Sequence, residues 1–164
     1  MPLEKAKKIC RTLVDYYGNN AVDLQGGEPT LYKDIFELVK FCDRIGLTPT
    51  LITNGLLLDK RETCERYLEA GVRDFLISVQ GLGDVHDCLV GCPGAHRRQM
   101  EAIENLRSLN IPFRFNVVMT KPALPQLPGI ARLAINSGAL VVNFITFNPF
   151  ADQSQGRRRS GENV

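Results

Sequence analysis

Residues 21–29 have the sequence AVDLQGGEP, an apolar run that ends in two glycines, an acid and a proline. The run Ala21–Gln25 predicts a β-strand that stops at the glycine pair. Gly26 and Gly27 allow the backbone to turn sharply and to approach a ligand closely. Glu28 then places one carboxylate at the mouth of this turn. The stretch therefore predicts a strand-to-helix switch with a negative charge at its tip.

The same order of strand and helix recurs along the whole chain. Helices of about 12 residues between short strands indicate parallel strands joined by crossover helices. The pattern predicts five helices, over Leu3–Tyr17, Lys33–Ile45, Asp59–Ala70, Ala95–Leu109 and Leu124–Ser137. It predicts five strands, over Ala21–Gln25, Thr50–Thr53, Phe75–Val79, Phe113–Met119 and Leu140–Phe147. Asp59 and Glu62 form a capping-box pattern at the start of the third helix. Because the series begins with a helix, we expect the first strand of the repeat to be missing.

This alternation fits either a doubly wound sheet or part of a barrel. A nucleotide-binding doubly wound sheet carries a G-x-G-x-x-G or P-loop fingerprint after an early strand, and the sequence has neither. Polar residues instead follow successive strands, where a barrel gathers its chemistry: Gln25, Glu28, Thr53, Asn54, Ser78, Gln80, Asn116, Thr146 and Asn148. We therefore predict an α/β fold, an incomplete (β/α) TIM-type part-barrel over residues 1–150. Residues 151–164 predict a polar, disordered tail.

Composition narrows the class of protein and its surroundings. The chain has 164 residues and 44% hydrophobic residues, which suits one globular domain. Its formal net charge of +2 gives no reason to expect a nucleic-acid partner. The sequence has no run of about 18 apolar residues, the length that a membrane span requires. The five cysteines are an odd number, which favours reduced thiols and a cytoplasmic location over a disulfide framework.

Three polar groups at strand ends are the candidate binding residues. Glu28 either binds a cationic ligand group or stabilises the turn at Pro29 through the helix dipole. Thr53 and Asn54 close the next strand and suit ribose hydroxyls or a carboxylate, although Asn-Gly is also a common turn. Ser78 and Gln80 close the following strand, and they too either contact a ligand or form a turn. Because these groups recur at the same relative position, we expect one shared site.

The Gly26–Pro29 turn resembles the motif with which radical S-adenosylmethionine (SAM) enzymes hold the amino group of SAM. The segment Asp84–Ala95 resembles the loop after the fourth strand in the activating and the peptide- and cofactor-maturing members, typified by pyruvate formate-lyase activation. The resemblance covers about residues 3 to 150. It implies that Gly26, Gly27 and Glu28 take the methionine amino group. It also implies ribose contacts from Ser78 and Gln80, and that Asn116 and Val118 lie by the adenine.

The resemblance also implies a [4Fe-4S] cluster, held by three cysteines spaced C-x3-C-x2-C, and the sequence contains no such triplet. Cys88 and Cys92 are spaced C-x3-C, but Ala95 stands where the third cysteine is needed. A zinc site at these two cysteines would need His86 and His96 as its further ligands. The favoured interpretation is instead that the two thiols are incidental. The family's cluster loop precedes its first helix, so we expect that loop immediately upstream of Met1.

The favoured hypothesis is the SAM-binding core of a radical SAM oxidoreductase or activating enzyme. In the full-length protein, such a core implies reductive cleavage of SAM to a 5′-deoxyadenosyl radical. It also implies a reductant such as flavodoxin or ferredoxin, and a substrate that is a protein, a peptide or a small molecule. On its own the chain is expected to be inactive. A non-catalytic binding domain derived from the same barrel is the alternative. A metal-dependent lyase or isomerase that uses Glu28 is a third hypothesis.

Overall fold

The computed structural model describes residues 1–146. It contains five strands, β1 (Ala21–Leu24), β2 (Thr48–Thr53), β3 (Asp74–Ser78), β4 (Phe113–Met119) and β5 (Val142–Thr146). The α-helices of this part are α1 (Leu3–Asp15), α2 (Ile35–Arg44), α3 (Arg61–Ala70), α4 (Asp84–Val90), α5 (Ala95–Ser108) and α6 (Leu127–Ser137). Three short 3-10 helices are η1 (Pro29–Leu31), η2 (Leu56–Asp59) and η3 (Leu124–Gln126). The predicted tail, and Phe147 and Asn148 beside the last strand, lie outside the described residues.

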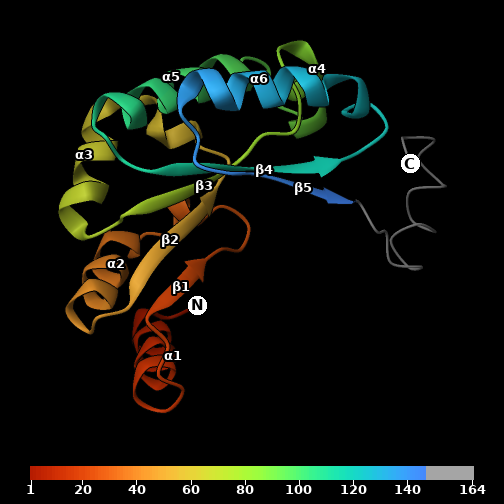
Figure 1. Ribbon diagram of the computed structural model, residues 1–164. Coiled ribbons are helices and arrows are strands. Elements are labelled where there is room, and N and C mark those ends of the chain that lie inside the picture. Colours follow the sequence, from red (N-terminus) through yellow and green to blue (C-terminus); the bar gives the residue numbers. More distant parts are fainter. Residues whose placement is uncertain (147–164) are drawn as a thin grey trace.

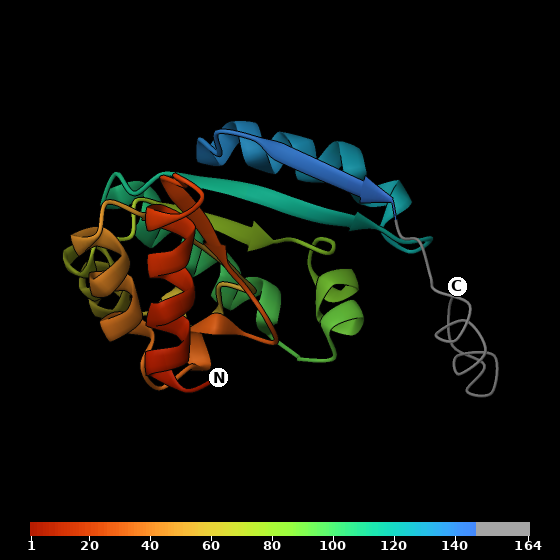
Figure 2. The ribbon, with the colours of Figure 1, turned by 90° about the horizontal axis from the view of Figure 1, so that it is seen from below.

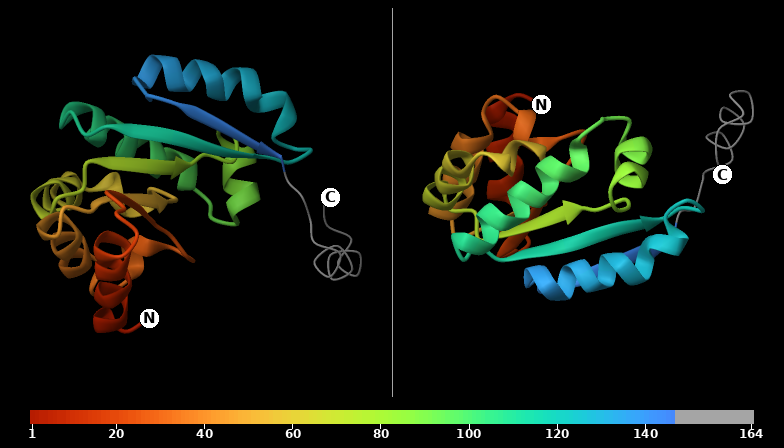
Figure 3. Two further views of the ribbon diagram at one scale, coloured as in Figure 1. Left: turned by 60° about the horizontal axis from the view of Figure 1, so that its bottom comes forward. Right: turned by 90° about the horizontal axis from the view of Figure 1, so that it is seen from above.

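The five strands form one parallel sheet in the order in which they occur along the chain. The sheet curves, with β1 and β5 at opposite edges and helices along its outer side (Figures 1 and 3). This arrangement is an open half-barrel, so the predicted α/β part-barrel is confirmed. Because all strands run the same way, their carboxyl ends meet at one rim of the sheet, where barrel enzymes hold their chemistry.

The hydrophobic core lies between the outer face of the sheet and the helices. Alternate residues of β3 and β4 point into it, and Phe75, Ile77, Phe115 and Val117 are all fully buried. The residues between them, including Ser78 and Asn116, belong to the opposite, concave face because strand side chains alternate. Burial of the outer face therefore fixes which side chains the concave face presents.

Helix α4 is absent from the sequence prediction, which treated Asp84–Ala95 as a loop. It raises the number of α-helices to six within residues 1–146. It lies beyond the end of β3, at the carboxyl rim of the sheet (Figure 2). The helix has only seven residues, too few for a clear apolar period, and its buried side chain is His86. Contacts from elsewhere in the fold hold it, so local periodicity does not reveal it.

The predicted capping box at the start of α3 is wrong. Lys60 is the residue that precedes the helix, and no side chain caps it. The Asp59 carboxylate instead accepts a hydrogen bond of 2.7 Å from Nε of Arg98, on α5. Asp59 thus bonds to Arg98, 39 residues away in the sequence, and does not cap the end of α3 as the local pattern predicted.

Candidate functional site

The Glu28 carboxylate is the centre of the polar contacts at the rim of the sheet. Its Oε1 atom accepts hydrogen bonds from the Thr30 amide (3.0 Å) and from the hydroxyls of Thr30 and Thr53 (both 2.6 Å). Its Oε2 atom accepts a 2.8 Å bond from the Asn54 amide. Glu28 therefore caps η1, as the turn-stabilising interpretation predicts, and also ties the turn after β1 to the end of β2.

The glycine pair shapes the wall of a cavity beside Glu28. Gly26 and Gly27 have φ angles of +123° and +49°, which side-chain-bearing residues rarely adopt. A Cβ atom at either position would meet no other atom within 4 Å, so open space lies above both glycines. The cavity has a volume of about 450 Å³ and is lined by Gln25, Gly26, Gly27, Glu28, Ile52, Thr53, Asn54 and Ser78. Six predicted site residues thus line one cavity: Gly26, Gly27, Glu28, Thr53, Asn54 and Ser78.

Three further predicted residues do not line this cavity: Gln80 lies shortly after β3, and Asn116 and Val118 lie on β4. Ser78 pairs in register with Asn116, and Asn116 pairs with Asn143 of β5. These three side chains form a polar row on the concave face. Oε1 of Gln80 accepts a hydrogen bond of 3.3 Å from the Val118 amide, so the Gln80 side chain continues the contact between β3 and β4.

Two further residues lie at this rim and were not among the predicted site residues, Thr30 and Asn143. The Thr30 hydroxyl contributes one of the two shortest contacts to Glu28, and only the fold of the turn shows it. The alternation of the strand pattern could have identified Asn143, because it lies between apolar residues that face the other way.

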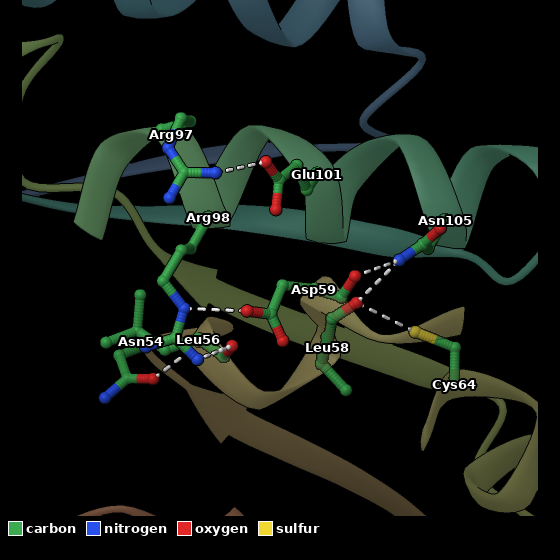
Figure 4. A network of polar contacts seen from close by, with 9 residues as sticks. All are labelled: Asn54, Leu56, Leu58, Asp59, Cys64, Arg97, Arg98, Glu101 and Asn105. Atoms are coloured by element: carbon green, nitrogen blue, oxygen red, sulfur yellow. Dashed lines mark hydrogen bonds and ion pairs between the residues drawn. The ribbon is translucent and has the colours of Figure 1, made fainter. Parts of the chain in front are cut away.

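Helix α5 holds the loop that follows β2 through a second polar network (Figure 4). Arg98 pairs with Asp59 and donates a 2.9 Å bond to the Leu56 carbonyl. Nδ2 of Asn105 donates to the carbonyls of Leu58 (3.0 Å) and Asp59 (2.9 Å). The hydrogen bond with Asp59 also raises the pKa of the Arg98 guanidinium. These contacts fix η2 to the outer helix layer, and its residues Leu56, Leu58 and Asp59 do not line the cavity.

Two histidines and one aspartate organise the segment from α4 to α5. Nδ1 of the buried His86 accepts a hydrogen bond of 3.3 Å from the Gln80 amide, and its ring lies 5.9 Å from that of His96. Asp87 accepts bonds from the amides of Gly94 (2.5 Å) and His96 (2.7 Å). These amide contacts, that of His96 first, lower the pKa of the Asp87 carboxyl. Burial lowers the pKa of both imidazoles below the ordinary value of 6.5.

The lowered pKa of His86 and His96 predicts that the protein loses stability as the pH falls below 6.5. Below pH 6.5 the histidines of the unfolded chain bind protons while those of the folded protein stay neutral. The free energy of unfolding therefore decreases until the pH reaches the folded pKa values. We expect a lower urea midpoint at pH 5.5 than at pH 7.5. The chain has only these two histidines, so the variant His86→Gln/His96→Gln should lose this part of the pH dependence. An unchanged difference between the two pH values would contradict the assignment.

The cysteines do not provide a metal centre in the described part of the chain. Cys10, Cys42 and Cys64 are buried, and all five cysteines are free. Burial raises the pKa of the Cys42 and Cys64 thiols to about 12, which keeps them protonated at neutral pH. Among residues 1–146, no three His, Cys, Asp or Glu side chains are placed to hold a metal ion.

A second cavity of about 650 Å³ lies between α1 and β1 and shares Gln25, Gly26 and Glu28 with the first. Within residues 1–146, none of the helices has the length and the hydropathy that a membrane span requires.

Comparison with known proteins gives consistent sequence matches. A family profile described as the Radical SAM superfamily matches residues 1–132. The chain is 37% identical over 134 residues to a PqqA peptide cyclase of Bradyrhizobium diazoefficiens, covering 81% of this chain and 35% of the cyclase. It is 30% identical over 158 residues to an AdoMet-dependent heme synthase of Oleidesulfovibrio alaskensis, covering 94% of this chain and 40% of the synthase. The chain thus spans well under half the length of these relatives.

Solved structures support the fold. The crystal structure of Streptococcus suis SuiB bound to S-adenosylmethionine matches with a TM-score of 0.79 at 22% identity, over 98% of this chain and 39% of that chain. SuiB bound to its precursor peptide SuiA matches with a TM-score of 0.78 at 25% identity, over 90% of this chain and 33% of that chain. The half-barrel is therefore a fold shared with SuiB, a protein that is seen with SAM and with a precursor peptide.

Proposed function

The chain belongs to the radical SAM superfamily, and we propose that its half-barrel is the SAM-binding core of such an enzyme. The observation that carries the proposal is the cavity of about 450 Å³ at the carboxyl rim, which six of the predicted residues line. Ligands of parallel α/β folds bind at this rim, where the chain leaves each strand.

The residues around the cavity fit the parts of SAM. The turn of Gly26, Gly27 and Glu28 presents backbone acceptors and one negative charge to the methionine ammonium group. Glu28 also stabilises the turn itself, because four protein donors engage its carboxylate. Thr53 and Asn54 lie beside that turn at the end of β2. The open space above the glycines is where the methionine part enters.

The row that starts at Ser78 extends the site from the cavity toward β4. We assign the ribose hydroxyls to Ser78 and Gln80, and the adenine to the neighbourhood of Asn116 and Val118. The register of β3 with β4 places Ser78 opposite Asn116, so the assigned ribose and adenine contacts are neighbours. When SAM is bound beside a reduced cluster, the transfer of one electron to SAM cleaves one of its carbon–sulfur bonds.

The cysteines of this chain do not fit the [4Fe-4S] cluster that the family implies. No C-x3-C-x2-C triplet occurs in the sequence, and Cys10, Cys42 and Cys64 are buried in the fold. We therefore propose that these 164 residues bind SAM and do not cleave it. A non-catalytic binding domain is the second candidate, favoured by the same lack of ligands.

The partners follow from the family and the relatives. Relatives that share this core are called a peptide cyclase and a heme synthase. We therefore place the choice of substrate in regions outside the shared core. A reductant such as flavodoxin or ferredoxin would serve the cluster-bearing enzyme. The five free cysteines support a cytoplasmic location.

Anaerobic calorimetric titration of SAM tests the proposal. We expect saturable binding of one SAM per chain, and no saturable heat would overturn the SAM-binding core. Reconstitution with iron and sulfide, followed by dithionite, tests the second statement. We expect no stable cluster and no 5′-deoxyadenosine. A stable cluster with SAM cleavage would show that this chain holds cluster ligands after all.

A further inference from the structure

Gln99 is a fully buried polar side chain that the assignments above leave without a role. It lies on α5, in the outer helix layer, yet its amide reaches the rim of the sheet. Nε2 donates hydrogen bonds to the carbonyls of Asn54 (2.9 Å) and Ser78 (3.0 Å). These two carbonyls belong to the ends of β2 and β3, the neighbouring strands that form one side of the cavity.

This bridge spans the point where the ladder between the two strands stops. The last pair in register between β2 and β3 is Thr53 with Ile77, so the next residues, Asn54 and Ser78, have lost the regular pairing. Without the amide of the buried Gln99, these two carbonyls would lack a donor, which would cost free energy and would let the strand ends separate. The Gln99 amide satisfies both with one rigid group, and so fixes the distance between the two ends.

We propose that Gln99 is a positioning residue for the SAM site, because its amide holds Asn54 and Ser78 at the spacing that the ligand requires. The proposal rests on the proposed function of the cavity. Gln99 does not line the cavity itself, so it acts through the two residues that it holds. A glutamine in a helix gives no local sign of the carbonyls that it contacts, so Gln99 was not among the predicted site residues.

Asn105 provides a matched control on the same helix. Its amide also donates two hydrogen bonds to two carbonyls, those of Leu58 and Asp59, and neither residue lines the cavity. The variants Gln99→Met and Asn105→Leu each replace the amide with an apolar group of similar shape. A merely structural role predicts similar consequences for the two, whereas positioning predicts that only the first weakens SAM binding.

The test is SAM titration of both variants at a temperature where both remain folded. We expect Gln99→Met to raise the Kd for SAM about tenfold or more, and Asn105→Leu to change it by less than about threefold. Equal effects of the two variants, or an unchanged Kd for Gln99→Met, would overturn the positioning role. Absence of SAM binding by the unaltered chain would instead overturn the proposed function.

Amide hydrogen exchange keeps the two failures distinguishable, since it needs no ligand. We expect Gln99→Met to speed exchange about tenfold or more at Asn54, Gly55 and Val79, whose amides are bonded at the strand ends. Asn105→Leu should act instead at Leu58, in η2. Unchanged exchange at the strand ends in Gln99→Met would show that Gln99 does not hold them, whether or not SAM binds.

Discussion

Replacing Glu28 with alanine is expected to lower the free energy of unfolding by about 3 kcal/mol and to abolish measurable SAM binding. The substitution leaves four donors without their acceptor, namely the amides of Thr30 and Asn54 and the hydroxyls of Thr30 and Thr53. Hydrogen bonds to a charged group are stronger than those between neutral groups, and Thr30 and Thr53 are both buried. The turn that presents the glycines would then be released from the end of β2.

Urea unfolding and SAM titration of Glu28→Ala measure the two effects. Glu69→Ala is the control, since Glu69 is an exposed carboxylate on α3, and we expect it to change stability by no more than about 0.5 kcal/mol. A destabilised Glu28→Ala protein that still binds SAM with unchanged affinity would leave Glu28 only its role in capping η1. Unchanged stability would contradict the hydrogen-bonded network itself.

Replacing Phe75 with alanine is expected to lower the free energy of unfolding by about 3 to 5 kcal/mol. Phe75 is fully buried on the central strand β3, with its ring 5.6 Å from that of Tyr67 in an edge-on arrangement. Tyr67 in turn stacks on Phe36 at 4.5 Å, so the aromatic contacts join β3 to α3 and α2. The cavity left by the missing ring is closed in by these elements and cannot collapse fully.

Phe75 belongs to the outer face of the sheet, so its substitution should lower the stability of the protein and leave SAM binding nearly unchanged. We expect the folded fraction of Phe75→Ala to bind SAM within about threefold of the unaltered chain, because the site lies on the other face. Chemical unfolding measures the stability. Leu31→Ala is the control, since Leu31 is 72% exposed and should tolerate truncation. A Phe75→Ala protein as stable as the unaltered chain would contradict the described core.

The sequence predicted the strands and the longer helices well, because their apolar periods are clear. The start of β2 shows a limit, since the strand begins at Thr48 and includes Pro49, which pairs with Val22. The predicted strand began one residue later than Pro49, at Thr50, and proline is rare in the interior of a strand. Helix α4 was missed because its seven residues are too few to show a clear apolar period.

The candidate site was predictable where glycines and polar residues follow a strand. Gly26, Glu28, Asn54 and Ser78 line one cavity, as their repeated positions indicated. The contacts among them were not predictable, because they depend on which strands become neighbours. Thr30 and Gln99 reach the site from a turn and from an outer helix, and nothing in their local sequence shows what they meet.

Mapping SAM onto the chain by amide chemical shifts is the most direct test of the central claim. The account predicts that SAM shifts the amides of Gly26, Gly27, Asn54, Ser78, Gln80, Asn116 and Val118, all at the carboxyl rim. Residues of the second cavity that lie on α1, such as Ile9 and Leu13, should stay unchanged. Shifts confined to α1, or no shifts at saturating SAM, would contradict a SAM site on the concave face of this half-barrel.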